Sequence, residues 1–348
     1  MPHSLPGERK IKVLIVDDSA IVRAVLTEML SAHPRIESVI TAPDPYVARN
    51  KILAEKPDVV TLDLKMPRMD GLTFLRKLMH YHPVPVVVIS SMVNVCAETA
   101  MEALRLGAVE VLPKPSGPYS VGDLRRDLPA KIMAAAMSTV KTGCFSAAPE
   151  DASDLAGFSP SKVVALGAST GGVQAVEAVL RGLPSNYPGI LIAQHIPAVF
   201  SASLAHRLDQ CCPIRVKEAQ DGDPVLPGQA LLAPGNRHLL VRRTAAGYSA
   251  MLGDGPPVCF QRPSVDVLFQ SVAESAGPDG IGVLLTGMGV DGADGLLAMK
   301  RSGARTIAQD QESCVVFGMP KEAIRKGAVD RVLPLPTIAS ALRAEARR

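Results

Sequence analysis

Several marks of membrane, secreted and nucleic-acid-binding proteins are missing from this chain of 348 residues. Its first ten residues, MPHSLPGERK, have no apolar core and so do not form a secretory signal. No apolar run approaches the roughly 18 residues that a membrane helix needs. The formal net charge is +3, which by itself is too small to indicate a nucleic-acid partner. We therefore expect a cytoplasmic protein that does not insert into a membrane.

The six cysteines lack any C-x-x-C spacing. They are Cys96, Cys144, Cys211, Cys212, Cys259 and Cys314. In a cytoplasmic chain such thiols are expected to be reduced, and we expect most of them to be buried. The adjacent Cys211 and Cys212 have no further Cys or His at zinc spacing, so no metal site is predicted there.

The proportions of apolar and charged residues indicate packed globular domains. Apolar residues make up 47% of the chain and charged residues 20%. A domain usually takes about 100–200 residues, so the length predicts two domains.

The first half of the chain alternates short apolar runs with helical patterns, from Ile11 to about Met137. A helix is predicted over SAIVRAVLTEMLSAH with Ser19 as its N-cap, and another over AETAMEALRLG, closed by Gly107. Strands are predicted over KVLIVDD, ESVITA, PDVVTLD, PVVVISS and AVEVLPKP. Repeated βα units of this kind predict a doubly wound parallel α/β sheet with helices on both faces.

A linker and a second α/β domain are predicted after this half. Residues 138–161 are rich in Ser, Ala, Gly, Pro and Asp and have no hydrophobic period, which is typical of an interdomain linker. The βα alternation then resumes at Lys162, which predicts a Rossmann-like domain over 162–348. One stretch, GQALLAPGNRHLLVRRTAAGYSAMLGDG, is broken by turn signals and predicts an antiparallel meander at the edge of the sheet.

Acidic residues stand at the carboxyl ends of the predicted strands in the first half, where open parallel sheets bind ligands. Asp17 and Asp18 follow the first strand, Asp63 follows the third, and Ser90 and Lys114 end the fourth and fifth. Any one aspartate could simply cap a helix. Three converging carboxylates need a cation, however, and oxygen ligands suit Mg²⁺. A carboxylate shielded in this way can accept a phosphoryl group, which the lysine would neutralise and the hydroxyl would bind.

This arrangement resembles the receiver domain of two-component response regulators. The motifs are VDDSAIVR, LDLKMPRMDGL, VVVISS and LPKP. The resemblance implies a flavodoxin-like receiver over residues 8–137, with Asp63 as the phosphoacceptor. It also implies that Mg²⁺ is held by Asp17, Asp18, Asp63 and the main-chain carbonyl of Lys65, and that Ser90 and Lys114 bind the phosphoryl group.

The second half raises a question at VVALGASTGGVQAV, residues 163–176. The glycine-rich turn after the strand could bind a phosphate, or it could present Ser169 as a nucleophile. Both common phosphate motifs, G-x-x-x-x-G-K-[ST] and G-x-G-x-x-G, are absent, and the next strand ends in His195 rather than in an acid. A serine before a helix is also often only an N-cap, so the nucleophile hypothesis depends on its partners.

Two candidate partners follow later strands. His195 comes after ILIAQ, and Asp291 comes after IGVLLTGMGV. In a parallel sheet these loops share one edge with Ser169, so the aspartate could orient the imidazole and the imidazole could take the serine proton. His206, His238 and Asp294 are alternatives. We expect His206 on a helix face and His238 in a structural or substrate-contacting role, and Asp294 could replace Asp291.

Two other kinds of output domain are alternatives to an enzyme. The second half could only bind a nucleotide or a partner protein, and Ser169 would then be a cap. A DNA-binding output is disfavoured because the second half has no helix-turn-helix unit with a basic recognition helix.

The second half resembles the catalytic domain of the chemotaxis protein-glutamate methylesterases, the CheB family. The motifs are LGASTGG, AQHIP, PGNRHL, LLTGMGVDGADG and FGMPKEAIRKGAVD. The resemblance implies hydrolysis of glutamate γ-methyl esters and deamidation of certain glutamines on chemoreceptors. It implies that Ser169 is the nucleophile, His195 the base and Asp291 its orienting acid, that the main chain of Met288 is an oxyanion donor, and that Thr170 lines the site.

Further expectations follow from the same resemblance. A chemotaxis histidine kinase would donate the phosphoryl group, methyl-accepting chemotaxis receptors would be the substrate, and the receiver would inhibit until it is phosphorylated. We expect no cofactor in the catalytic domain, no nucleic-acid partner and a monomer.

Overall fold

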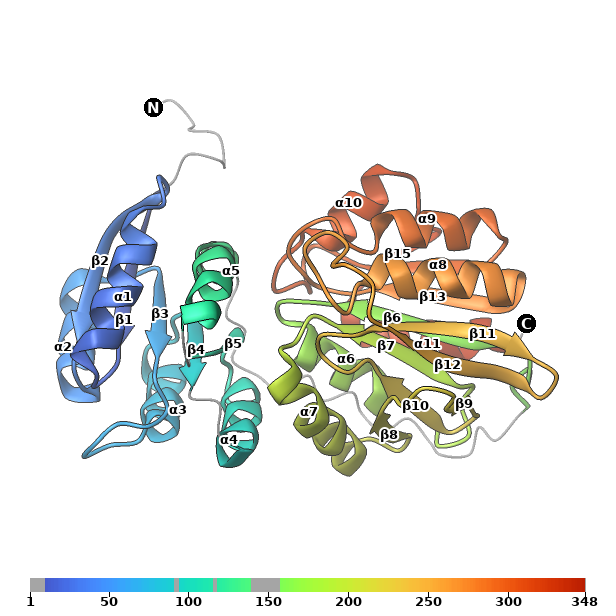
Figure 1. Cartoon of the computed structure of the whole chain (residues 1–348), viewed down its shortest axis with the longest axis horizontal. Helices are drawn as coiled ribbons and strands as arrows, with labels where there is room; N and C mark the ends of the chain where they lie inside the picture. Colours follow the sequence, from blue (N-terminus) through green and yellow to red (C-terminus); the bar gives the residue numbers. More distant parts are fainter. Residues whose placement is uncertain (1–9, 91–93, 115–117, 139–156, 348) are drawn as a thin grey trace. The chain divides into compact units, whose positions relative to one another are not determined.

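The computed structural model describes residues 10–90, 94–114, 118–138 and 157–347. The chain divides into two compact units, Met1–Gly143 and Cys144–Arg348, each with its own sheet (Figure 1).

The first unit is a five-stranded parallel sheet with the strand order β2-β1-β3-β4-β5. This order is the flavodoxin-like one, whose switch point lies between β1 and β3. Helix α1 packs beside α5, and α3 packs beside α4. The elements are β1 (Ile11–Val16), α1 (Ala20–Ser31), β2 (Ile36–Ala42), α2 (Pro45–Glu55), β3 (Val59–Leu62), α3 (Gly71–Tyr81), β4 (Val86–Ser90), α4 (Asn94–Arg105), β5 (Glu110–Pro113) and α5 (Pro118–Ala136).

Local sequence signals in this unit are confirmed. The Ser19 hydroxyl caps α1 by accepting from the Val22 N–H. Gly107 follows α4 at a φ of 108°, a conformation that favours glycine. All residues of β3 and β4 are buried, as expected for central strands covered on both faces.

The second unit is a seven-stranded sheet with the order β15-β14-β13-β6-β7-β10-β8, in which every pair is parallel. Helices α8 and α9 pack side by side, and α6 packs beside α7 and α11. Its elements up to β10 are β6 (Val163–Ala168), α6 (Gly172–Arg181), β7 (Ile190–Gln194), α7 (Ala198–Cys211), β8 (Arg215–Glu218), β9 (Pro224–Val225) and β10 (Gln229–Leu232). The remaining elements are β11 (His238–Thr244), β12 (Gly247–Gly253), α8 (Val265–Ala276), η1 (Gly277–Asp279), β13 (Gly280–Leu284), α9 (Ala293–Arg301), β14 (Arg305–Gln309), α10 (Met319–Arg325), β15 (Arg331–Leu333) and α11 (Leu335–Glu345).

The stretch predicted as one edge meander divides between two sheets. Its first run, QALL, is β10, which lies between β7 and β8 inside the parallel sheet. The physical reason is burial, since Ala230, Leu231 and Leu232 are fully covered, as in an interior parallel strand. The later runs, β11 and β12, pair antiparallel and join β9 in a separate three-stranded sheet, with α8 packed against β11. Two doubly wound α/β domains with an antiparallel element are therefore confirmed.

The cysteine expectation is partly wrong. Four described cysteines are free thiols, but only Cys314 is buried, while Cys211 and Cys212 are half-buried and Cys259 is exposed. These three lie at a helix end or in a loop, where the fold leaves side chains uncovered. The side chain of Cys96, and all of Cys144 with most of the predicted linker, lie outside the described residues.

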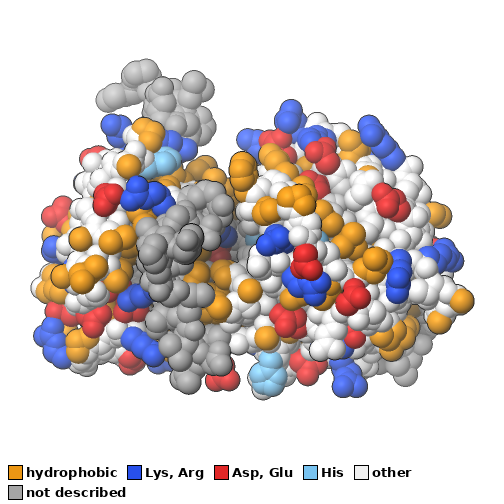
Figure 2. All heavy atoms as spheres, viewed as in Figure 1, with side chains coloured by type: hydrophobic (Ala, Val, Ile, Leu, Met, Phe, Trp, Pro, Cys, Tyr) orange, Lys and Arg blue, Asp and Glu red, His pale blue; other side chains and the backbone are white. Residues whose placement is uncertain are grey.

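Two surface properties agree with the composition. None of the described helices is both long and apolar enough to span a membrane. On the face shown in Figure 2, Lys and Arg side chains are interspersed with Asp and Glu, and no continuous basic surface is visible over the described residues there.

Candidate active site and phosphorylation site

Ser169 lies in the tight turn between β6 and α6. Its N–H donates to the Thr286 carbonyl at 3.0 Å. Its carbonyl accepts from the Gly172 N–H at 2.7 Å and from Gln194 Nε2 at 2.9 Å. The turn is therefore held from three sides, which fixes where the Ser169 side chain leaves the backbone.

Two glycines permit this close packing. Gly171, which precedes α6, has a φ of 76°, a left-handed conformation that other residues adopt at a cost. A Cβ on Gly287 would lie 2.7 Å from the Ser169 Cβ, closer than two carbon atoms can approach. The loop after β13 can thus pass directly against the serine only because position 287 has no side chain.

His195 and Asp291 form a buried pair beside this turn. His195 Nε2 lies 2.7 Å from Asp291 Oδ2, and the two side chains are 3% and 2% exposed. His195 follows β7 and Asp291 lies in the loop after β13, and these strands flank β6 on either side. The neighbouring carboxyl ends of three parallel strands therefore bring together the loops that carry Ser169, His195 and Asp291.

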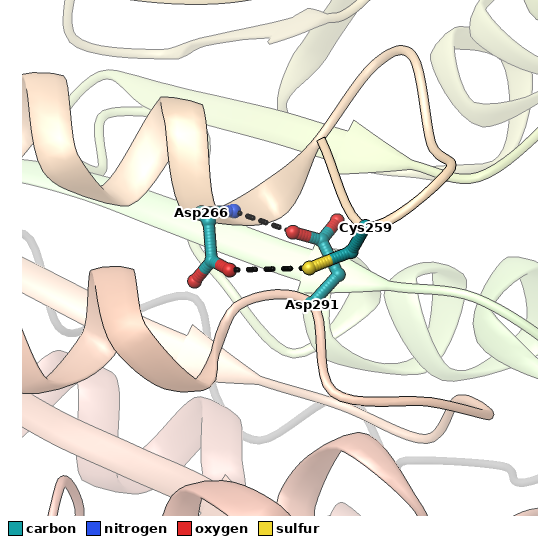
Figure 3. A group of neighbouring side chains, drawn as sticks. All are labelled: Cys259, Asp266 and Asp291. Atoms are coloured by element: carbon teal, nitrogen blue, oxygen red, sulfur yellow. Dashed lines mark hydrogen bonds between the residues drawn. The ribbon is translucent and has the colours of Figure 1, made fainter. Parts of the chain in front are cut away.

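The start of α8 surrounds the Asp291 carboxylate with donors. The Ser264 hydroxyl donates to Oδ1 at 2.7 Å, and the Val265 N–H donates to Oδ2 at 2.7 Å. The Asp266 N–H donates to Oδ1 at 3.0 Å, as Figure 3 shows. These groups sit at the positive end of the α8 dipole, which favours an anion.

The donors keep Asp291 ionised. Burial by itself raises the pKa of the Asp291 carboxyl, but the hydrogen bond and charge of His195 and the donors at the start of α8 outweigh it and hold this pKa below its ordinary value. An ionised carboxylate accepts the Nε2 proton of His195, which leaves Nδ1 as the basic nitrogen.

Asp266 ties the same helix to the far end of the Asp291 loop. Its Oδ1 accepts from the Gly295 N–H at 2.6 Å. Burial, together with the negative charges of Asp291 and Asp294, raises the pKa of Asp266 to about 6. The backbone of Asp266 thus supports Asp291 while its side chain anchors the start of α9.

Cys259 completes the acidic group drawn in Figure 3. Its Sγ lies 3.9 Å from Asp266 Oδ2, and Cys259, Asp266 and Asp291 offer ligand atoms within 4.8 Å of one another. Both oxygens of Asp291 already accept hydrogen bonds from protein donors, however. We therefore attribute this group to the positioning of Asp291 and not to metal binding.

The alternative residues pair with groups other than Ser169, His195 and Asp291. His238 is buried, and its Nδ1 accepts from the Ser264 N–H at 3.2 Å while its Nε2 donates to the Pro256 carbonyl at 3.1 Å. His206 lies on α7 and pairs with Gln210 at the surface. Asp294 forms an ion pair with Lys326.

Met288 follows a glycine that is fixed by backbone hydrogen bonds. The Gly287 carbonyl accepts from the N–H groups of Gly318 and Met319. Among the described residues, no acceptor is paired with the main-chain N–H of Met288, which suits a donor reserved for a ligand. Thr170 is buried, and its carbonyl accepts from the Thr286 hydroxyl at 3.0 Å.

Within the described part of the chain, no hydrogen bond joins Ser169 Oγ to His195. The structure therefore shows the His195–Asp291 pair and the fixed serine turn, which are the two parts of the proposed triad.

Two supporting residues are not predicted from the sequence: Gln194, which holds the Ser169 carbonyl, and Ser264, which holds the Asp291 carboxylate. His238, expected in a structural or substrate-contacting role, accepts a hydrogen bond from the Ser264 N–H. The sequence SVDVLF does signal an N-cap at Ser264. The sequence does not show that Asp291, 27 residues further along, contacts this cap, because the contact depends on tertiary packing.

The first unit has a second polar site at the carboxyl edge of its sheet. Lys114 Nζ contacts Asp17 Oδ2 at 2.7 Å and Asp63 Oδ2 at 2.8 Å. Both aspartates are buried, while Asp18 is exposed. Carboxylate oxygens of Asp17, Asp18 and Asp63 lie within 4.8 Å of one another.

Burial and charge oppose each other in this site. Burial raises the pKa of Asp63, and Asp17 adds to this effect, so that the Lys114 ion pair only partly offsets it. For Lys114, burial acts to lower its pKa, but hydrogen bonds and ion pairs with both carboxylates raise it overall. The lysine is therefore the cation that holds two buried carboxylates together.

The Ser90 hydroxyl lies at the end of β4 without a hydrogen-bond partner among the described residues. Ser90 is fully buried. A buried hydroxyl normally finds a partner. Together with three carboxylates that would repel one another without a cation, it fits a site built to take Mg²⁺ and a phosphoryl group.

The fold and the two sites define a class, a two-domain response regulator whose second domain is an enzyme. A profile described as "CheB methylesterase" matches residues 164–342, and one described as "Response regulator receiver domain" matches residues 13–123. The chain belongs to the CheB methylesterase family.

Individual relatives agree. The chain is 52% identical over 334 residues to the protein-glutamate methylesterase/protein-glutamine glutaminase 2 of Syntrophus aciditrophicus, which covers 95% of this chain and 97% of the relative. It is 48% identical to the protein-glutamate methylesterase/protein-glutamine glutaminase of Salmonella typhimurium, with 97% of each chain covered. The crystal structure of the Thermotoga maritima CheB methylesterase catalytic domain is 41% identical, with a TM-score of 0.51, and the match covers 52% of this chain and 96% of that one.

Proposed function

We propose that this chain is a phosphorylation-regulated protein-glutamate methylesterase and protein-glutamine glutaminase that acts on chemoreceptors. The observation that carries the proposal is the buried pair of His195 and Asp291 at the sheet edge beside the glycine-flanked turn of Ser169. The names of relatives about 50% identical over nearly the whole chain support the substrate class. They do not favour the alternative of an output domain that only binds a nucleotide or a partner.

In this proposal Ser169 is the nucleophile. His195 Nδ1 takes the Oγ proton while Oγ attacks the γ-carbonyl carbon of the methylated glutamate. Asp291 stabilises the imidazolium that forms, because its carboxylate already accepts the Nε2–H. The main-chain N–H of Met288 donates to the developing oxyanion, and Thr170 lines the site.

The intermediate then breaks down in two steps. The bond from carbon to the methoxy oxygen breaks, and that oxygen takes the proton from His195 and leaves as methanol. A water molecule next gives a proton to His195 and attacks the acyl carbon, and Ser169 Oγ leaves with that proton. The product is a glutamate carboxylate. With a glutamine substrate the same steps release ammonia.

We propose Asp63 as the phosphoacceptor of the first domain. Asp17, Asp18, Asp63 and the main-chain carbonyl of Lys65 would hold Mg²⁺, which supplies charge neutralisation during phosphoryl transfer. Lys114, whose ammonium group contacts both Asp17 and Asp63, would neutralise the phosphoryl oxygens on Asp63. The unpaired Ser90 hydroxyl would donate to the same oxygens.

The wider assignment follows the same resemblance. The receiver would span residues 8–137, the linker 138–161 and the catalytic domain 162–348. A chemotaxis histidine kinase would be the phosphodonor and methyl-accepting receptors the substrate. We expect a cytoplasmic monomer in which phosphorylation shifts the population towards the active state.

Covalent labelling tests the nucleophile. A serine-directed fluorophosphonate should label the purified chain at Ser169, and methylated receptor should compete with the label. Ser169→Ala should leave the chain unlabelled, while Ser161→Ala, a serine just before β6, should not change labelling. Equal labelling of the Ser169→Ala protein would overturn the assignment.

A further inference from the structure

We propose that Cys211 and Cys212 form a redox site, in which a hydroperoxide converts the two adjacent thiols into a disulfide. Their Sγ atoms lie 3.8 Å apart, already in contact. Both side chains are half-buried, which leaves them partly accessible to a small oxidant. The established family and the proposed reaction use neither residue.

The end of α7 gives this pair some freedom to move. Cys211 is the last residue of the helix, and Cys212 has an extended backbone with ψ of 150°. The Cys212 N–H still donates to the Leu208 carbonyl. One thiol is therefore fixed to the helix and the other begins the loop, so the sulfur atoms can approach each other by a change in the loop alone.

Neighbouring charges favour one thiolate. Arg181 on α6 lies beside Cys211, and its guanidinium is also paired with Glu177. The hydrogen bond from the Cys212 thiol, helped by Arg181, lowers the pKa of Cys211 to about 7 although burial opposes it. The hydrogen bond with Cys211 raises the pKa of Cys212, and burial and the negative charge on Cys211 raise it further. The pair thus contains one nucleophilic sulfur and one thiol that keeps its proton.

The two steps balance with a hydroperoxide as the oxidant. The Cys211 thiolate attacks one peroxide oxygen, an S–O bond forms, the O–O bond breaks, and the leaving oxygen takes a proton to give water. Cys212 sulfur then attacks the sulfenic sulfur, the S–S bond forms, and the hydroxyl leaves with the Cys212 proton as a second water. Two thiols are oxidised and one hydrogen peroxide is reduced to two waters.

The product should be easy to reduce. Consecutive Cα atoms are about 3.8 Å apart, whereas disulfides usually join Cα atoms about 4.4–6.8 Å apart. The bond between neighbours is therefore strained, and strained disulfides are the labile ones. We infer a reversible site and not a structural cross-link.

The other described cysteines provide internal controls. Cys314 is buried. Cys259 is largely exposed, and the partial burial of its thiol and the nearby carboxylates raise its pKa. In the described residues, neither has a second thiol within contact. Peroxide should therefore leave Cys314 unchanged and should not give Cys259 an intrachain disulfide partner.

Mass spectrometry of the full-length chain tests the proposal. After treatment with one equivalent of hydrogen peroxide and alkylation of the remaining thiols, the tryptic peptide LDQCCPIR should carry no alkyl group and should lack two hydrogen atoms. Dithiothreitol should restore double alkylation. Arg181→Gln should slow disulfide formation at pH 7 by about fivefold, as a rise of roughly one unit in the pKa of Cys211 would give. Arg181→Lys, which keeps the charge, should change it less.

Three results would overturn the site. In the first, peroxide leaves Cys211 and Cys212 as open to alkylation as Cys314. In the second, Cys211 is oxidised to the sulfinic acid while Cys212 stays a free thiol. In the third, the disulfide joins two chains. Cys212→Ser separates these cases, because it should leave a trappable sulfenic acid on Cys211. Circular dichroism of each variant shows whether the fold is kept.

Discussion

Asp291 Oδ2 accepts a hydrogen bond from His195 Nε2 at 2.7 Å, and the same carboxylate is held from behind by the start of α8. This relationship fixes the imidazole tautomer before any substrate arrives. In the proposed mechanism it leaves His195 Nδ1 free to serve as the base towards Ser169.

Asp291→Asn should nearly abolish hydrolysis while the fold is kept. The amide can donate to His195 Nε2, so the imidazole proton moves to Nδ1, where a base is needed. Removal of the orienting acid from serine triads lowers kcat by about 10⁴-fold. The measurement is kcat with a methylated receptor substrate, with circular dichroism as the control for folding. A loss below about tenfold would show that Asp291 is not the orienting acid.

Ser264→Ala should lower kcat with little change in KM. It removes one of the donors to the Asp291 carboxylate, and a hydrogen bond to a charged group contributes about 1.5–3 kcal/mol. We expect kcat to fall by roughly tenfold or more. The acidic limb of the pH profile should move to higher pH, because the pKa of Asp291 rises when a donor is lost.

Ser264→Thr is the matched control. It keeps the hydroxyl and should keep both the rate and the pH profile near those of the wild type. A purely structural role for Ser264 would change the melting temperature of the alanine variant without any shift of the pH profile.

Asp266→Asn should stabilise the protein at pH 8 but not at pH 4. The folded-state pKa of Asp266 is raised to about 6, so its contribution to stability is present at pH values below the unfolded pKa and is lost as pH rises through about 6. The neutral amide removes this loss and can still accept from the Gly295 N–H. We expect a gain of about 1 kcal/mol at pH 8, because partial exposure of the carboxyl screens the effect.

Thermal unfolding of both proteins across this pH range is the measurement. Asp294→Asn is the comparison, since that side chain is mostly exposed and paired with Lys326. An equal gain at pH 4 and pH 8 would contradict the assigned titration.

Asp63→Asn should abolish phosphorylation. The variant should take no label from acetyl phosphate or from a phosphorylated kinase, and chelation of Mg²⁺ should prevent labelling of the wild type. Asp58→Asn, whose carboxylate accepts from the Lys12 N–H before β3, is the control and should still be labelled. Full labelling of Asp63→Asn would place the acceptor elsewhere.

The sequence predicts much of the fold because the central strands of both parallel sheets are short, apolar and buried. The helix signals at Ser19 and Gly107 agree with the structure because caps depend on local chemistry. The error over QALL arose because a buried parallel strand and an antiparallel hairpin strand have the same apolar composition. Only the partner strands distinguish them, and these lie far away in sequence.

Only those site residues that follow the ends of strands could be predicted from the sequence. His195 and Asp291 could be paired because parallel strands bring their carboxyl ends to one edge. Ser264 could not be connected to Asp291, nor His238 to Ser264, because these contacts depend on how the start of α8 packs against its neighbours. The supporting residues of a site are set by tertiary structure, and the motif residues are set by the local sequence.

Methanol release from membranes that contain methylated chemoreceptors tests the central claim most directly. Purified wild-type chain should release methanol, and the initial rate should rise when Mg²⁺ and acetyl phosphate are added. Ser169→Ala should be labelled normally at Asp63 yet release no methanol above background under either condition. Release by Ser169→Ala at a rate near that of the wild type would contradict the assignment of this chain as a serine methylesterase.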